Sequence, residues 1–116
     1  MKLGVFCDGI SRDLKHSQDF MDEFDLEYAE LQFIGDREVG DHTAGEIRKI
    51  GSLLRDRGKP VSCLSRQIFA GMTISNKPRD ALHTKHMGAL KRVMDMAHAL
   101  GSPLVRIMTP KKEQIL

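Results

Sequence analysis

The sequence contains no tryptophan, and Tyr28 is its only tyrosine. No run of like charge reaches five residues, and the net charge of the 116-residue chain is only +2. Surfaces that bind nucleic acids concentrate basic residues, so this composition argues against a nucleic-acid partner. No apolar run approaches the length of a membrane-spanning helix, and the apolar run in the opening MKLGVFCDG is too short for a signal peptide. We therefore expect a cytoplasmic protein with no nucleic-acid or membrane partner.

Cysteine is also scarce, because Cys7 and Cys63 are the only two in the chain and no CxxC pair occurs. Both lie in apolar stretches, which favours two reduced, partly buried thiols over a disulfide framework. The remaining composition, with 41% hydrophobic and 29% charged residues, is that of a folded globular domain.

One unit recurs three times along the chain: an amphipathic helix, a break, and then a short β-prone run. We expect helices over residues 11–24, 43–57 and 78–100, and strands over 2–8, 26–34, 60–69 and 103–108. The apolar side of each helix should carry Leu14, Phe20, Met21 and Phe24 in the first, Ile47, Ile50, Leu53 and Leu54 in the second, and Met87, Leu90, Val93, Met94, Ala97 and Leu100 in the third.

Start and stop signals agree with these helices. Ser11 can cap the first helix, and Thr43 with Glu46 forms a Thr-x-x-Glu capping box for the second. Gly58 and Gly101 fit the left-handed position that follows a helix end, and two residues after each comes a proline that would begin a strand.

The order β-α-β-α-β-α-β predicts an α/β fold with parallel strands joined by helical crossovers. Such a fold is either an open doubly wound sheet or a segment of a parallel (β/α) barrel of the TIM type. A complete barrel needs about 250 residues, so four strands make half of one. The sequence also has no helix to cover the fourth strand before it ends at Leu116. Both features favour the half-barrel.

The strings KLGVF, YAELQF with DREVGDH, VSCLSRQIFAG and ALHTKHMGALKRVMDMAHALGSPLVRIMT resemble the xylose-isomerase-like barrels, which are described as sugar phosphate isomerases or epimerases. The resemblance covers residues 1–116 as the N-terminal half of such a barrel. Its most specific parts are Glu30 in YAELQ and the helix-to-strand phrase AHALGSPLVRIMT.

This resemblance implies a metal-assisted proton transfer next to the carbonyl of a sugar or sugar phosphate. The divalent ion (manganese, magnesium, zinc or cobalt) would be held by Glu, Asp and His residues of the later strands. We therefore expect no metal ligand in this chain, catalytic residues beyond Leu116, and no activity from the 116 residues alone.

Five residues are expected to form part of the substrate-facing wall. The resemblance places Phe6 and Glu30 inward, and period two along the strand adds Gln32. Arg66 and Arg106 are charged residues in apolar strands, where facing the helices would bury them unpaired, so the polar barrel mouth is the cheaper location. The open alternative is that Glu30 and the arginines form structural ion pairs.

Two histidines form a further substrate-binding candidate. His83 and His86 are three residues apart near the start of the third helix, hence on one face, and helix starts lie at the catalytic end of such a barrel. They could contact a substrate phosphate. The alternative is a solvated helix start, and two histidines alone do not make a metal site.

Two other functions remain open. Apurinic endonucleases share this barrel, but their His-rich metal cluster uses ligands from the third and fourth strands, and CLSRQIF and VRIMT contain no histidine. The third hypothesis is a non-catalytic half-barrel whose open sheet edges pair with those of a second copy to give a homodimer.

Overall fold

The computed structural model describes residues 1–73, 75 and 80–111 of the chain. These residues form an α/β fold with a parallel four-stranded sheet, three α-helices, a short 3-10 helix and a small hairpin. In chain order the elements are β1 (Gly4–Phe6), η1 (Cys7–Gly9), α1 (Leu14–Glu23), β2 (Tyr28–Leu31), β3 (Phe33–Ile34), β4 (Arg37–Glu38), α2 (Ala44–Asp56), β5 (Val61–Ser65), α3 (Ala81–Leu100) and β6 (Val105–Arg106).

The main sheet has the strand order β1-β2-β5-β6, and every neighbouring pair is parallel. A helix separates each strand from the next one along the sheet, as the repeating pattern predicted. The strand order follows the chain order without a reversal.

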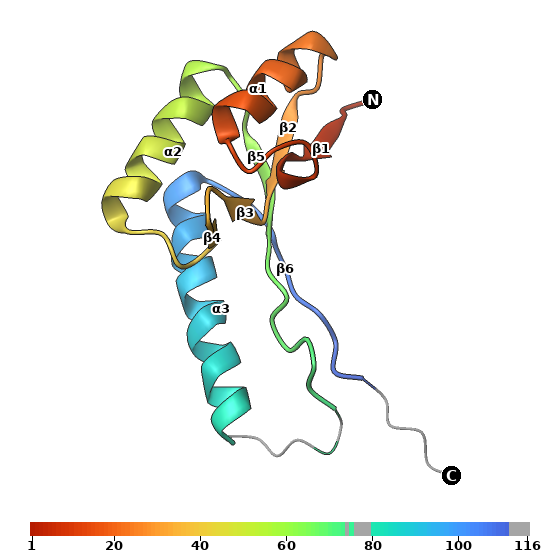
Figure 1. Cartoon of the computed structure of the whole chain (residues 1–116), viewed down its shortest axis with the longest axis vertical. Helices are drawn as coiled ribbons and strands as arrows, with labels where there is room; N and C mark the ends of the chain where they lie inside the picture. Colours follow the sequence, from red (N-terminus) through yellow and green to blue (C-terminus); the bar gives the residue numbers. More distant parts are fainter. Residues whose placement is uncertain (74, 76–79, 112–116) are drawn as a thin grey trace.

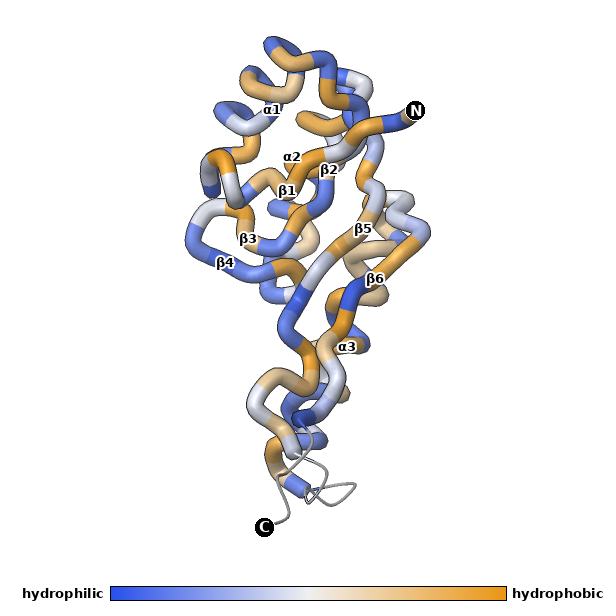
Figure 2. Tube along the Cα trace, turned by 90° about the vertical axis from the view of Figure 1, so that its right-hand side faces the viewer, coloured by the Kyte–Doolittle hydropathy of each residue, from blue (hydrophilic) through white to orange (hydrophobic). Residues whose placement is uncertain are grey.

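The helices cover one side of the sheet. Figure 1 shows α2 and α3 on the same side of the strands, and Figure 2, turned by 90°, shows the strands in front with these helices behind them. Burying apolar side chains between the two layers is the main driving force for this arrangement. The core between the layers includes Ala29, Leu31, Val61 and Leu64 from the strands and Ile50, Leu54, Val93, Met96 and Ala97 from the helices.

A β-bulge sets which side chains of β5 face away from the helices. Ala29 pairs with Val61, but the next residue, Glu30, pairs with Cys63, so Ser62 is the extra residue. Regular alternation would put residues 61, 63 and 65 on one face. The bulge instead leaves Val61 and Leu64 under the helices and turns Cys63 and Ser65 to the uncovered face.

The antiparallel hairpin of β3 and β4 was not expected from the sequence. Phe33 pairs with Glu38 and Ile34 with Arg37, and Gly35 adopts a left-handed φ of +66° in the turn. The predicted strand over 26–34 is therefore split into β2 and β3. The hairpin carries Glu38 and the following residues toward α3, which matters for the site described below.

The first helix buries a different face from the one predicted. Leu14 and Met21 are buried as expected, but Phe20 and Phe24 are 37% and 57% exposed, with ring centroids 4.5 Å apart. Polar Ser17 and Gln18 are fully buried in their place. The Ser17 hydroxyl lies within hydrogen-bonding distance of two backbone carbonyls, and Gln18 donates to the carbonyl of Leu53 in α2. In α3, Met87 and Met94 are likewise exposed.

Most of the predicted helix boundaries hold to within a few residues. The capping box of Thr43 and Glu46 is present, and Gly58 and Gly101 have left-handed φ values of +63° and +71°. Asp13, rather than Ser11, caps α1 by accepting from the backbone N–H of Lys15.

The third helix begins at Ala81 with Asp80 as its cap; its predicted start at Pro78 lies outside the described residues, as do residues 112–116. In the part of the chain that the structure describes, no helix is both long and apolar enough to cross a membrane.

Candidate functional site

Glu30 lies near the middle of the sheet on the face that the helices leave uncovered. Its side chain is 28% exposed, and its Oε1 accepts a hydrogen bond of 2.5 Å from the hydroxyl of Ser65. The guanidinium of Arg106, on the next strand, lies 4.0 Å from the same oxygen. Three neighbouring strands, β2, β5 and β6, thus bring a carboxylate, a hydroxyl and a cation together at one place.

The same face carries Phe6 and Cys63, which are the register partners of Glu30 on β1 and β5. Phe6 is half-buried and supplies an apolar surface beside the carboxylate. The other cysteine, Cys7, is 2% exposed. Burial, with the charges of Asp8 and Glu30 adding to it, raises the pKa of the Cys7 thiol to about 12, so this thiol stays protonated near neutral pH.

Arg66 lies one residue beyond β5 and has three partners. Its Nη1 donates to the backbone carbonyl of Val39 at 2.9 Å and lies 2.9 Å from the carboxylate of Asp41, while its Nε lies 3.4 Å from Glu38. The Arg66 side chain is only 15% exposed. These contacts correspond to the ion-pair alternative for Arg66, with partners that come from the hairpin and the loop after it.

Gln32 and Arg92 extend this network on either side. The Gln32 amide donates to Glu38 at 3.1 Å, and Arg92 of α3 lies 3.2 Å from the carboxylate of Asp41. The pKa of Asp41 lies below its ordinary value: burial opposes this shift, but hydrogen bonds and charges from Arg66 and Arg92 outweigh it. The network therefore fixes the hairpin between the end of β5 and the middle of α3.

The two histidines of α3 flank Phe69. His86 accepts a hydrogen bond at Nδ1 from the backbone N–H of Phe69, at 3.0 Å. The ring centroid of Phe69 lies 6.3 Å from that of His83 and 5.8 Å from that of His86. Since Nδ1 accepts, a neutral His86 carries its proton on Nε2. His86 therefore holds the loop after β5, whose residue Phe69 adopts an unusual φ of +67°.

A cleft of about 430 Å³ brings several of these residues together at the carboxyl ends of β2 and β5. Gln32, Arg66 and His86 line it, and all three are among the predicted site residues. The lining also includes side chains that the sequence did not single out, among them Lys85, Arg92, Glu38 and Gln67. Phe6, Glu30, His83 and Arg106 are not part of the cleft wall.

The residues that sequence reasoning missed depend on contacts between distant segments. The contact of Ser65 with Glu30 depends on the bulge, which the sequence did not predict. The contacts of Glu38 and Asp41 with Arg66 depend on the hairpin, which was not predicted either. Lys85 and Arg92 did carry a signal, because they are seven residues apart and Ala89 lies between them on the same helix face. That spacing predicts two cations in one row over a small side chain.

The uncovered face does not fit the divalent ion that the resemblance implies. Glu30 is the one carboxylate in the Glu30–Ser65–Arg106 group, and a metal ion there would meet the positive charge of Arg106. Among the described residues, no three or more His, Cys, Asp or Glu side chains lie close enough together to hold a metal ion.

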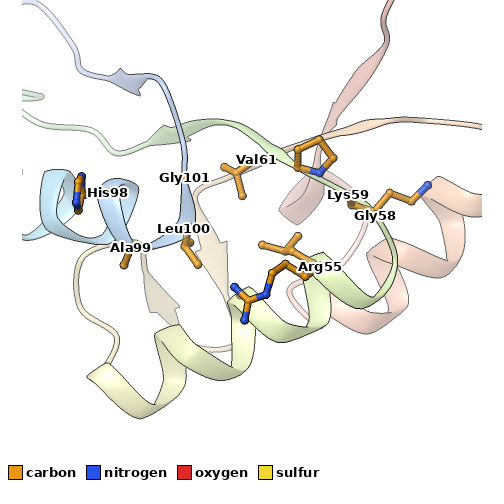
Figure 3. A pocket seen from close by; sticks show the side chains of 11 residues that line it. Arg55, Gly58, Lys59, Val61, His98, Ala99, Leu100 and Gly101 are labelled. Carbon is orange, nitrogen blue, oxygen red and sulfur yellow. The ribbon is translucent and has the colours of Figure 1, made fainter.

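A larger cavity, of about 570 Å³, lies at the opposite end of the sheet (Figure 3). It lies between the ends of α2 and α3, with Val61 at the start of β5 in its wall. In (β/α) barrels the catalytic end is the carboxyl end of the strands, and this cavity is at the amino end. None of the predicted site residues lines it.

Comparisons with known proteins do not identify a family for this chain. No model of a protein family matches the sequence, and no curated protein matches it either. The functional assignment therefore depends on the residues and their geometry.

Proposed function

We propose that this chain forms part of a (β/α) barrel that binds a sugar or sugar phosphate and belongs to an isomerase or epimerase. The single observation that carries the proposal is the Glu30–Ser65–Arg106 group on the uncovered face of a parallel sheet. A largely buried carboxylate in the middle of a sheet is costly unless polar groups contact it. In a barrel this face points inward, toward the ligand.

The chemistry of the group suits a polyhydroxy compound. The second oxygen of Glu30 can accept a hydrogen bond from a sugar hydroxyl, and Arg106, whose side chain is 54% exposed, can donate to a carbonyl or hydroxyl oxygen. Ser65 holds Oε1 in place, so the carboxylate is oriented before a ligand arrives. Phe6 gives the apolar face of a sugar ring a surface to stack on.

The reaction class follows from the resemblance together with this binding surface. Isomerisation and epimerisation both remove a proton next to a carbonyl, and a residue outside the Glu30 group would serve as the base. Within the described residues, Glu30, Ser65 and Arg106 bind and orient the sugar.

We would test sugar binding by nuclear magnetic resonance, titrating the 116-residue chain with a panel of aldoses, ketoses and their phosphates. We expect saturable shifts of the Phe6, Glu30 and Arg106 amides for at least one sugar. Glu30→Gln removes a hydrogen bond to a charged group and should weaken binding about tenfold. If every sugar leaves these amides unchanged, the proposal is wrong.

Glu27→Gln is the matched control, because Glu27 is an exposed glutamate just before β2 and outside the Glu30 group. It changes the net charge by the same amount and should leave the affinity unchanged. Equal losses for Glu30→Gln and Glu27→Gln would mean that overall charge, rather than the Glu30 site, controls binding.

A second candidate function is self-assembly, which the two sheet edges favour. Among the described residues, β1 and β6 each pair with one strand only, and so present unpaired backbone groups. Exposed apolar side chains accompany both edges, with Leu3 beside β1 and Leu104 and Ile107 on either side of β6. A second copy, related by a two-fold axis, could pair β6 with β1 twice and close the sheet.

A further inference from the structure

The cleft at the carboxyl ends of β2 and β5 has a basic wall along the first half of α3. Lys85, Ala89 and Arg92 all line it and follow one another at the spacing of a single helix face. Ala89 is 4% exposed and small, so it leaves room between the two cations. Over seven residues the helix rises about 10 Å, a gap that two long flexible side chains can close around one ligand.

The cations of this wall differ in how far they are already paired. Arg66 has Glu38, Asp41 and the Val39 carbonyl as partners, so two carboxylates already offset its positive charge. Arg92 contacts Asp41 through one nitrogen and keeps its other donors. Lys85 is exposed and forms no ion pair with the described residues. The positive charge of the cleft that carboxylates offset least is therefore on α3.

His86 adds a neutral donor next to these charges. Its Nδ1 is occupied by the Phe69 N–H, so its Nε2–H remains as the donor on the other side of the ring. Gln67, from the loop after β5, also lines the cleft. A cluster of one ammonium, one guanidinium and one imidazole N–H matches the oxygens of a phosphate group.

We propose that this cleft binds the phosphate of a phosphorylated ligand, through Lys85, Arg92 and His86. This assignment rests on the proposed function, since it makes the sugar bound at Glu30 a sugar phosphate. Glu38 also lines the cleft, but it is engaged by Arg66 and Gln32, so it opposes the anion less than an unpaired carboxylate would.

The test is a titration of the full chain with inorganic phosphate, followed by the amide signals of residues 85–92. We expect saturable binding that weakens as salt is added. Lys85→Gln should weaken it about tenfold, while Lys91→Gln, an exposed lysine on the same helix that does not line the cleft, should not. Equal effects of the two variants, or no saturable binding, would overturn the assignment.

Further titrations separate the two proposals, using a phosphorylated sugar and the same sugar without its phosphate. Tighter binding of the phosphorylated form, with the difference lost in Lys85→Gln, supports the phosphate site. If the neutral sugar shifts the Glu30 face but the phosphate adds no affinity, the phosphate site fails while the proposed function stands. If inorganic phosphate binds the cleft but no sugar shifts the Glu30 face, the proposed function fails instead.

Discussion

Gly40 allows the loop after the hairpin to pack closely on α3, because it has no side chain. Its φ is +97°, which L-residues rarely adopt. A Cβ at this position would lie 2.8 Å from Cγ2 of Val93 and 3.2 Å from the Val93 backbone nitrogen. No substitution avoids both problems, so the close approach of loop and helix requires glycine here.

Gly40→Ala should therefore lower the free energy of unfolding by about 3 kcal/mol or more, combining backbone strain with an overlap in the core. The control is Gly58→Ala, because Gly58 also has a left-handed φ of +63°, but a Cβ added there would meet no atom within 4 Å. It should lose only about 1 kcal/mol. Urea unfolding measures the free energy of unfolding of both variants. Equal losses would show that the contact with Val93 does not contribute to the cost of Gly40→Ala.

At the scale of the element, α2 is the helix whose start is most completely defined. The Thr43 hydroxyl accepts from the Glu46 N–H at 3.2 Å, and the Glu46 carboxylate accepts from the Thr43 N–H at 3.0 Å. These hydrogen bonds, with the charge of Arg37 assisting, hold the pKa of Glu46 below its ordinary value. The two bonds satisfy N–H groups that have no partner inside the helix.

Thr43→Ala should cost about 1 kcal/mol of stability, measured by urea unfolding at neutral pH. Ser52→Ala, an exposed change within the same helix, should be nearly neutral. Because the pKa of Glu46 is lowered in the folded state, its contribution is present above its ordinary pKa and disappears as the pH falls through the folded value. A Thr43→Ala loss no larger than that of Ser52→Ala would contradict this role of the capping box.

Prediction from the sequence succeeded for the periodicity and start of α2 but failed for the buried face of α1. The period of α2 and its capping box are local signals, and both are confirmed. The apolar face of α1 is also a local signal, yet Phe20 and Phe24 are exposed, whereas Gln18 is buried and donates a hydrogen bond to the Leu53 carbonyl. A hydropathy pattern cannot anticipate a polar residue that gains a buried partner from another helix.

At the scale of the whole molecule, the edges that β1 and β6 leave unpaired among the described residues govern whether the chain is a monomer or a dimer. Pairing of both edges with a second copy would bury Leu3, Leu104 and Ile107, which are all exposed in the single chain. The hydrophobic gain and the new backbone hydrogen bonds both favour association.

We expect sedimentation to detect a concentration-dependent dimer of the 116-residue chain. Ile107→Lys places a charge beside the β6 edge and should shift the equilibrium toward monomer. Met94→Lys is the control, since Met94 is also exposed but belongs to α3 and to neither edge strand. A wild-type chain that remains monomeric at every concentration would rule out edge pairing.

The sequence by itself determined the alternation of helices and strands and the parallel sheet that follows from it. It also singled out Glu30 and Arg106, which the structure brings to 4.0 Å from each other. The helices and strands follow from the short-range periodicity of apolar residues. The two charged residues could be singled out because a charge within an apolar strand is unusual in any packing arrangement.

Only the tertiary structure decided which partners these residues have. The bulge at Ser62 turns Ser65 toward Glu30, and the hairpin supplies Glu38 and Asp41 to Arg66. The bulge has no local signal, because it forms where β5 is pressed against the distant β2. The hairpin is local, with Gly35 and Asp36 as its turn, but its contacts with Arg66 form only when the chain after β5 packs beside it. The sequence shows no partner for Arg66, which is why the polar mouth is its expected location. In the folded chain its partners are the carboxylates of Glu38 and Asp41.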